Sequence, residues 1–134
     1  MVREWVLDSA RQLRVLRAEL HEAVTGNILP GDGRLADVPE RMVVVATELA
    51  TNALRHGRPP SIVVLSRTAA HHVIDIADHD PTVLPEYAGA RPPGAGGLGL
   101  RMAMRLSLEI GWYVTDRTKH VWALFPLPDQ PAPA

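Results

Sequence analysis

Two polar residues in the segment ELATNALRHG have the types and spacing of a metal and proton-transfer site. Glu48 and Asn52 are four residues apart, so on a helix they share a face, one turn from each other. Arg55 and His56 continue that face. A carboxylate and an amide oxygen placed in this way suit a hard cation with a nearby proton acceptor. Taken alone, the spacing favours the polar, solvated face of an amphipathic helix.

A second group of acidic residues follows an expected strand, in the run DIADHDP that ends at Pro81. A carboxylate at Asp78 would point into any crevice beyond the strand end. The alternative is an Asp-Pro turn that leaves the strand, which is a common arrangement. Considered singly, this run favours the turn.

The third group is the glycine-rich run GAGGLGL, residues 94–100, which leads into an expected helix. Glycines let backbone N–H groups approach a ligand closely, and a helix N-terminus favours anions. Phosphate binding is therefore the functional interpretation, and a flexible linker is the alternative. The run lacks the Gly-Lys-Ser/Thr ending of a Walker A loop, and no early βαβ unit surrounds it as a dinucleotide fingerprint requires.

Local signals place these groups on helices and strands. Leucines and Val24 recur at helical spacing in the first expected helix. Pro39 suits the first position of the second helix, and Gly57 stops it. We predict strands at 2–7, 61–66, 73–77, 110–115 and 120–125, helices at 9–24, 39–56 and 98–108, and an irregular stretch at 79–97.

This order of elements predicts an α+β fold. We expect a two-layer sandwich in which about three helices cover one face of a mostly antiparallel, mixed sheet. Residues 1–127 would form one domain, and the Pro/Ala-rich residues 128–134 a disordered tail.

Composition excludes several classes of function. The 134-residue chain has a formal net charge of -1, so it offers no strong basic field for nucleic acid. It has no cysteine, which excludes disulfides and thiolate zinc sites. No apolar run reaches membrane-spanning length. We expect a cytoplasmic protein.

Taken together and in this order, the three groups resemble the N, G1 and G2 boxes of the GHKL ATPases: ELATNALRHG, DHDPT and GAGGLGL. The resemblance is closest to the small bacterial anti-sigma-factor serine/threonine kinases, and it spans residues 3–125, including the final KHVWALF segment. It implies a Bergerat-type ATP-binding fold, with the irregular stretch as the ATP lid.

The resemblance also implies roles for residues of this chain. Asn52 would hold Mg²⁺, and Glu48 would act as general base or polariser on the attacking hydroxyl. Asp78 would accept a hydrogen bond from the adenine amino group. The phosphates would be wrapped by Gly97, Leu98, Gly99 and Leu100.

This sequence departs from the family pattern in both glycine-containing boxes. The G1 pattern Asp-x-Gly-x-Gly has Asp80 and Thr82 in place of its glycines, and Ala95 stands where the G2 box has its first glycine. An extra carboxylate near the nucleotide would weaken binding unless it points away.

The resemblance implies ATP and Mg²⁺ as cofactors. It implies a sigma factor and a STAS-type antagonist as partners, the antagonist supplying the phosphorylated serine or threonine, and a homodimer. Arg14 and Arg17 on the first helix are candidates for a partner-facing surface, although ordinary solvated arginines explain them as well.

Two other functions remain open at this point. A pure binding protein would sequester a regulator through the same fold with little or no ATP. A metal-dependent phosphohydrolase is the remoter alternative, with ligands drawn from His56, His71, His72, His79 and Asp80. His71 and His72 are adjacent in or near a strand, so they would point to opposite faces.

Overall fold

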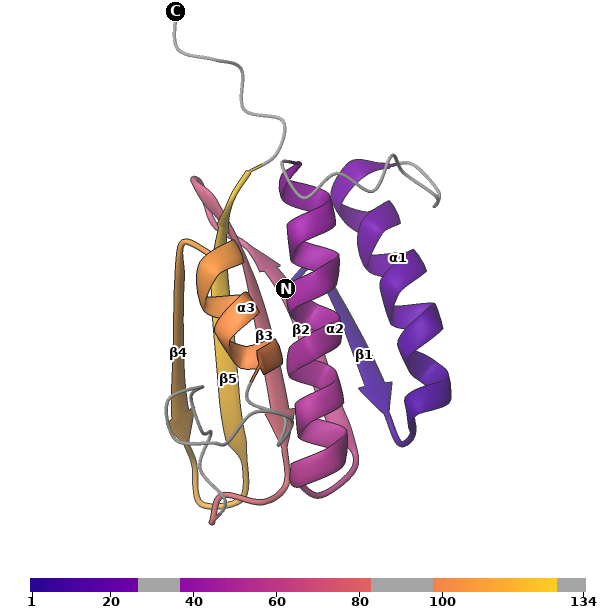
Figure 1. Cartoon of the computed structure of the whole chain (residues 1–134), viewed down its shortest axis with the longest axis vertical. Helices are drawn as coiled ribbons and strands as arrows, with labels where there is room; N and C mark the ends of the chain where they lie inside the picture. Colours follow the sequence, from indigo (N-terminus) through magenta and orange to yellow (C-terminus); the bar gives the residue numbers. More distant parts are fainter. Residues whose placement is uncertain (27–36, 83–97, 128–134) are drawn as a thin grey trace, which may run out of the picture.

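Five strands form one sheet in which every pairing is antiparallel (Figure 1). The structure is a computed structural model that describes residues 1–26, 37–82 and 98–127. The strand order is β1-β2-β3-β5-β4. The strands are β1 (Arg3–Leu7), β2 (Ser61–Arg67), β3 (His71–Asp78), β4 (Glu109–Val114) and β5 (Lys119–Pro126).

In the part of the chain that the structure describes, three α-helices cover one face of this sheet (Figure 1). They are α1 (Leu13–Thr25), α2 (Val38–His56) and α3 (Leu98–Leu106), and a short 3-10 turn, η1 (Ala10–Gln12), precedes the first. The helix α2 lies between α1 and α3 and packs against both. The prediction of a two-layer α+β fold is confirmed.

The bounds of α2 follow from residues at its two ends. Asp37 is the N-cap, and Pro39 lies in the first turn, where its missing N–H costs no hydrogen bond. At the other end, the Gly57 N–H closes the last turn on the Ala53 carbonyl at 2.9 Å. Between these ends, apolar side chains at helical spacing are buried, including those of Met42 and Leu49.

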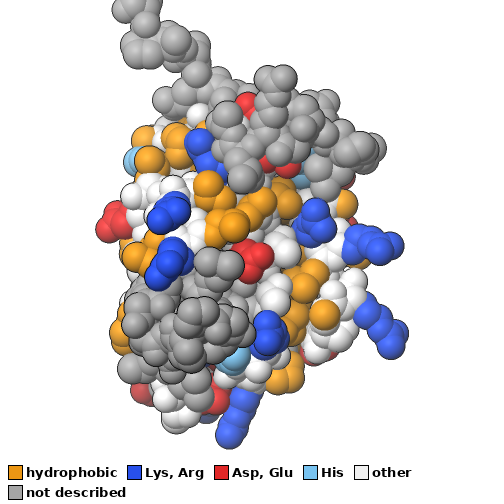
Figure 2. Space-filling view, viewed as in Figure 1, with side chains coloured by type: hydrophobic (Ala, Val, Ile, Leu, Met, Phe, Trp, Pro, Cys, Tyr) orange, Lys and Arg blue, Asp and Glu red, His pale blue; other side chains and the backbone are white. Residues whose placement is uncertain are grey.

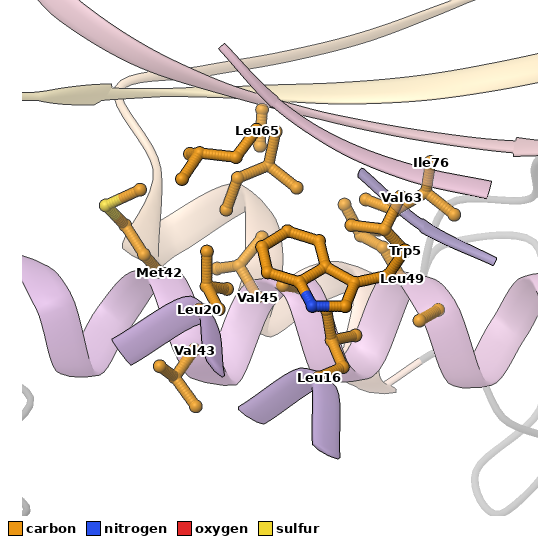
Figure 3. Packing of buried hydrophobic residues seen from close by; sticks show 14 of the residues in the cluster. Trp5, Leu16, Leu20, Met42, Val43, Val45, Leu49, Val63, Leu65 and Ile76 are labelled. Carbon is orange, nitrogen blue, oxygen red and sulfur yellow. The ribbon is translucent and has the colours of Figure 1, made fainter. Parts of the chain in front are cut away.

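The hydrophobic core lies between the sheet and the first two helices (Figure 3). Leu16 and Leu20 of α1 and Leu49 of α2 meet the sheet around the Trp5 indole, whose exposed fraction is 7%. The indole Nε1 donates to Glu19 Oε1 at 3.0 Å. This hydrogen bond ties α1 to the edge strand β1, so the burial of Trp5 costs no unpaired donor.

Two helix ends differ from the predicted bounds by two residues or more. The first α-helix starts at Leu13, because the Gln12 side chain accepts hydrogen bonds from the Asp8 and Ser9 N–H groups and holds the preceding residues in a 3-10 turn. The third ends at Leu106, not at residue 108, because the Leu108 N–H pairs with a carbonyl of β5, at Leu124, at 2.8 Å.

No helix in the described part of the chain is long and apolar enough to cross a membrane. The predicted tail at 128–134 and most of the predicted irregular stretch lie outside the described residues.

The end of α1 generates a test of this fold. Gly26 has φ 77°, and a Cβ there would meet no atom within 4 Å. Replacing Gly26 by Ala therefore adds only the cost of left-handed backbone, and we expect it to lower the free energy of unfolding by about 1 kcal/mol. Gly26→Asn should cost less, because asparagine tolerates this conformation. Denaturant titration measures both, and equal stability of Gly26→Ala and the unaltered protein would contradict the assignment.

Candidate functional site

The predicted site residues come from elements that meet at one end of the molecule. The carboxyl end of α2, the end of β3 and the start of β5 lie there, and α3 points its amino end toward it (Figure 1). The strand register agrees, since Asp78 at the end of β3 pairs with Lys119 at the start of β5. This arrangement brings the three sequence groups toward one place, although they are distant along the chain.

Glu48 and Asn52 lie one turn apart on α2, beside its buried stripe. Both side chains are half-buried, while Ala46, Leu49 and Ala53 on the neighbouring face are buried against the sheet. The Glu48 and Asn52 side chains therefore project from a well-packed helix, and each remains partly exposed to solvent. Two oxygen-bearing side chains on a rigid element suit a hard cation and a hydroxyl group.

Asp78 is the most deeply buried carboxylate of the candidate site. Its exposed fraction is 2%. Lys119 Nζ lies 3.3 Å from Asp78 Oδ2, and Asp78 Oδ1 accepts a hydrogen bond from the Asp80 N–H at 2.8 Å. Lys119 is itself buried, with 6% exposed. A buried carboxylate needs such partners, because an unpaired charge in a protein interior is strongly unfavourable.

The end of α2 touches Asp78 directly. A Cβ at Gly57 would lie 2.3 Å from Asp78 Cγ, which is closer than any side chain can approach. The residues that follow Gly57 and Asp78 in the sequence also bond to each other. The His79 N–H donates to the Arg58 carbonyl at 3.0 Å, and His79 Nδ1 lies 2.9 Å from the Pro60 carbonyl oxygen. The helix end and the strand end therefore form one connected unit.

Asp80, the extra carboxylate in the G1-like run, is engaged by its own turn. Its Oδ1 accepts hydrogen bonds from Thr82 Oγ1 at 2.5 Å and from the Thr82 N–H at 3.0 Å. These bonds lower the pKa of Asp80, and the positive charges of Arg58 and Lys119 act in the same direction. Because Oδ1 accepts both bonds from Thr82, the Asp80 carboxylate is held within its own turn. The positive charges of Arg58 and Lys119 partly balance its negative charge.

The glycine-rich segment is only partly described. Leu98, Gly99 and Leu100 form the first turn of α3, whose free N–H groups can bind an anion. Gly97 and Ala95 lie outside the described residues, as does nearly all of the predicted lid.

Arg14 and Arg17 do not join this site. Both side chains are exposed on α1, which lies on the far side of α2 from α3 (Figure 1). They remain candidates for a partner-facing surface.

The described histidines do not assemble a metal centre. Among residues 1–26, 37–82 and 98–127, no group of three His, Cys, Asp or Glu side chains could hold a metal ion. His72 is buried and the adjacent His71 is half-buried, as expected for neighbours on opposite faces of a strand.

Sequence reasoning missed Lys119 as a partner of Asp78. Lys119 immediately precedes the strand predicted at 120–125, yet it begins β5 and is buried. One signal was present in the sequence, because Lys119 is the only lysine among the 14 lysines and arginines of the chain. It is therefore the one position of the chain with a compact ammonium group in place of a planar guanidinium group.

A polar cluster on the face of the sheet opposite the helices was also missed. His120 Nδ1 lies 2.7 Å from Asp75 Oδ1, and Tyr113 donates to Asp75 Oδ2 at 3.1 Å. The Tyr113 and His120 rings stack at 4.5 Å. Partial burial and the Asp75 charge raise the pKa of Tyr113 above its usual value. Asp75 and Asp78 are three apart in β3 and so face opposite ways, which separates this cluster from the candidate site.

Comparisons with known proteins agree with the fold. A family model described as the histidine kinase-like ATPase domain matches residues 6–125. The structure resembles that of the Acinetobacter baumannii histidine kinase AdeS with a TM-score of 0.55 and 12% identity, covering 96% of this chain and 70% of that chain. At that identity the likeness concerns the fold alone. A search of curated proteins found no significant match.

The contact between α2 and β3 yields a prediction. Gly57→Ala should lower the free energy of unfolding by about 1–3 kcal/mol, because the added methyl group must displace the buried Asp78 carboxylate or the helix end. Arg58→Ala is the matched control and should leave stability nearly unchanged, since the Arg58 side chain is 76% exposed. Urea denaturation compares the two. A Gly57→Ala protein as stable as the control would mean that the contact is not rigid.

Proposed function

Because the chain belongs to the family of histidine kinase-like ATPase domains, we propose that it is an ATP-binding anti-sigma factor. In this proposal it is a serine/threonine kinase that phosphorylates a STAS-type antagonist. The family match supports the ATP-binding regulatory role. The finer assignment rests on the resemblance of the three motifs to the small anti-sigma kinases, together with the placement of their residues.

The observation that carries the proposal is the position of Asp78. Its carboxylate is buried at the end of β3, against the carboxyl end of the helix that bears Glu48 and Asn52. A buried carboxylate is a strong and selective hydrogen-bond acceptor, because it has lost its water and gains most from an N–H donor. In the proposed complex Asp78 accepts from the adenine amino group.

The donor set on α2 fits magnesium. Mg²⁺ prefers oxygen ligands and often takes only one from the protein, with phosphates and water completing its shell. The Asn52 side-chain oxygen is such a ligand, half-buried and fixed on a helix. Bound magnesium would neutralise negative charge on the phosphates.

Glu48 is the proposed proton acceptor for the incoming hydroxyl. It lies one turn before Asn52 on the same face of α2, so a group held near the metal is within its reach. Phosphoryl transfer depends mainly on positioning and on charge stabilisation. Glu48 would orient the serine or threonine hydroxyl of the antagonist for in-line attack and take its proton.

The first turn of α3 is the proposed phosphate cradle. Its residues Leu98, Gly99 and Leu100 carry backbone N–H groups with no partner inside the helix, and the helix dipole favours an anion there. Gly97 precedes them in the sequence and would allow the phosphates to approach the backbone closely.

The exposed face of α1 is the proposed surface for the sigma factor or the antagonist. Arg14 and Arg17 are exposed there, and Val15 between them is 51% exposed. Figure 2 shows basic side chains projecting along the side of the molecule where α1 lies. An apolar side chain flanked by arginines suits a partner that has both acidic and apolar groups. The proposed assembly also includes a homodimer.

A second function, a binding module with little catalysis, is favoured by one feature. Asp80 stands where the family pattern has a glycine, and it brings a carboxylate close to Asp78, where the adenine is proposed to bind. The hydrogen bonds from Thr82 limit the repulsion between the Asp80 carboxylate and a phosphate group, but the carboxylate keeps its negative charge.

Calorimetric titration with Mg-ATP separates the two functions. We expect micromolar binding to the unaltered protein, at least about tenfold weaker binding to Asp78→Asn, and loss of magnesium dependence in Asn52→Ala. Glu48→Gln should still bind ATP but transfer phosphate to a STAS-domain substrate about 100-fold more slowly or worse.

Glu4→Gln is the matched control, because Glu4 is exposed on the edge strand β1 and belongs neither to the candidate site nor to the proposed partner surface on α1, and it should behave as the unaltered protein. Circular dichroism verifies that each variant is folded. Binding without phosphoryl transfer from the unaltered protein would favour the binding module. The kinase proposal fails if millimolar Mg-ATP produces no binding.

A further inference from the structure

The buried pair of Asp78 and Lys119 has a composition that stability alone does not explain. Their exposed fractions are 2% and 6%, and Lys119 Nζ lies 3.3 Å from Asp78 Oδ2. Removing two charges from water is costly, and well-packed apolar residues often serve a fold equally well or better. A retained buried pair therefore calls for another role at this position.

The identity of the basic residue points in the same direction. Lys119 is the only lysine among 14 lysines and arginines. Lysine presents a compact ammonium group with rotatable donors, whereas arginine presents a broad planar fork. Asp78 and Lys119 are paired at the buried ends of β3 and β5. The Lys119 ammonium group has three N–H donors, so it can donate to a second acceptor while it remains beside the Asp78 carboxylate.

The pair presents an acceptor beside a donor, and this pattern matches one purine edge. Adenine carries a donor, the N6 amino group, next to an acceptor, N1. Guanine carries the reverse order, the O6 acceptor next to the N1–H donor. A base whose position-6 group faces Asp78 would meet a hydrogen-bond acceptor if it is adenine, and electrostatic repulsion if it is guanine.

We propose that Lys119 is a specificity-determining residue for the base, donating a hydrogen bond from its ammonium group to adenine N1 while Asp78 accepts from the amino group. This inference rests on the ATP-binding function proposed above. It adds to that function a second base contact, from β5, which would reinforce the discrimination of adenine from guanine nucleotides.

Ligand analogues test the contact atom by atom on the unaltered protein. The probes are ATP, GTP, 1-deaza-ATP, in which N1 is replaced by C–H, and 7-deaza-ATP as the matched control. We expect 1-deaza-ATP to bind about 10- to 100-fold more weakly than ATP, as loss of a charged hydrogen bond predicts. GTP should bind at least as weakly, and 7-deaza-ATP should bind like ATP.

Substitutions then assign the effect to Lys119. Lys119→Met should bind ATP and 1-deaza-ATP equally, whereas Arg117→Met, an exposed neighbour in the turn, should keep the full difference. Because Lys119→Met leaves a lone buried carboxylate, a second variant combines it with Asp78→Asn. That variant buries no charge at the pair and keeps an oxygen for the amino group, and it too should lose the difference.

The possible failures are distinguishable. If ATP and 1-deaza-ATP bind with equal affinity, the inference is overturned, while the ATP-binding function still stands. A difference that persists in the Lys119 variants overturns it as well, because another group would then contact N1. Absence of all nucleotide binding overturns the proposed function, and the inference with it.

Discussion

The carboxyl end of α2 lies directly against the Asp78 side chain, and the candidate site depends on this contact. Only glycine at position 57 allows it, because a Cβ would lie 2.3 Å from Asp78 Cγ. The contact joins the helix layer to the sheet at the point where β3 ends. It thereby places the polar face of α2, with Glu48 and Asn52, at the same end as the buried carboxylate. The large hydrophobic core beneath α1 and α2 holds both elements in this position.

Charge at this end of the molecule is arranged so that Asp78 and Asp80 each have a defined partner. Asp78 is paired with Lys119 inside the fold, and Asp80 is held by its own turn through Thr82. The two carboxylates are close in sequence but differ in environment, so they are suited to different tasks. In the proposed function Asp78 recognises the ligand, whereas Asp80 stabilises the turn that follows β3 and donates its backbone N–H to Asp78.

Local signals in the sequence predicted the elements well, and contacts between distant residues were out of reach. The helix predicted at 39–56 is Val38–His56, because Pro39, Gly57 and a regular apolar stripe all act within the helix itself. The third helix was predicted two residues too long, since its end depends on pairing with β5. Asp78 was identified by motif, but its partner Lys119 depends on the β3–β5 register, which no single-sequence pattern specifies. For the same reason the cluster of Asp75, Tyr113 and His120 was missed.

In the proposed function the end of β3 and the polar face of α2 hold one adenine nucleotide between them. A crystal structure of the protein with Mg²⁺ and a non-hydrolysable ATP analogue tests it most directly. We expect the adenine amino group within hydrogen-bonding distance of Asp78 and a magnesium ion about 2.1 Å from the Asn52 side-chain oxygen. A nucleotide bound elsewhere, or one with its base turned away from Asp78, would contradict it.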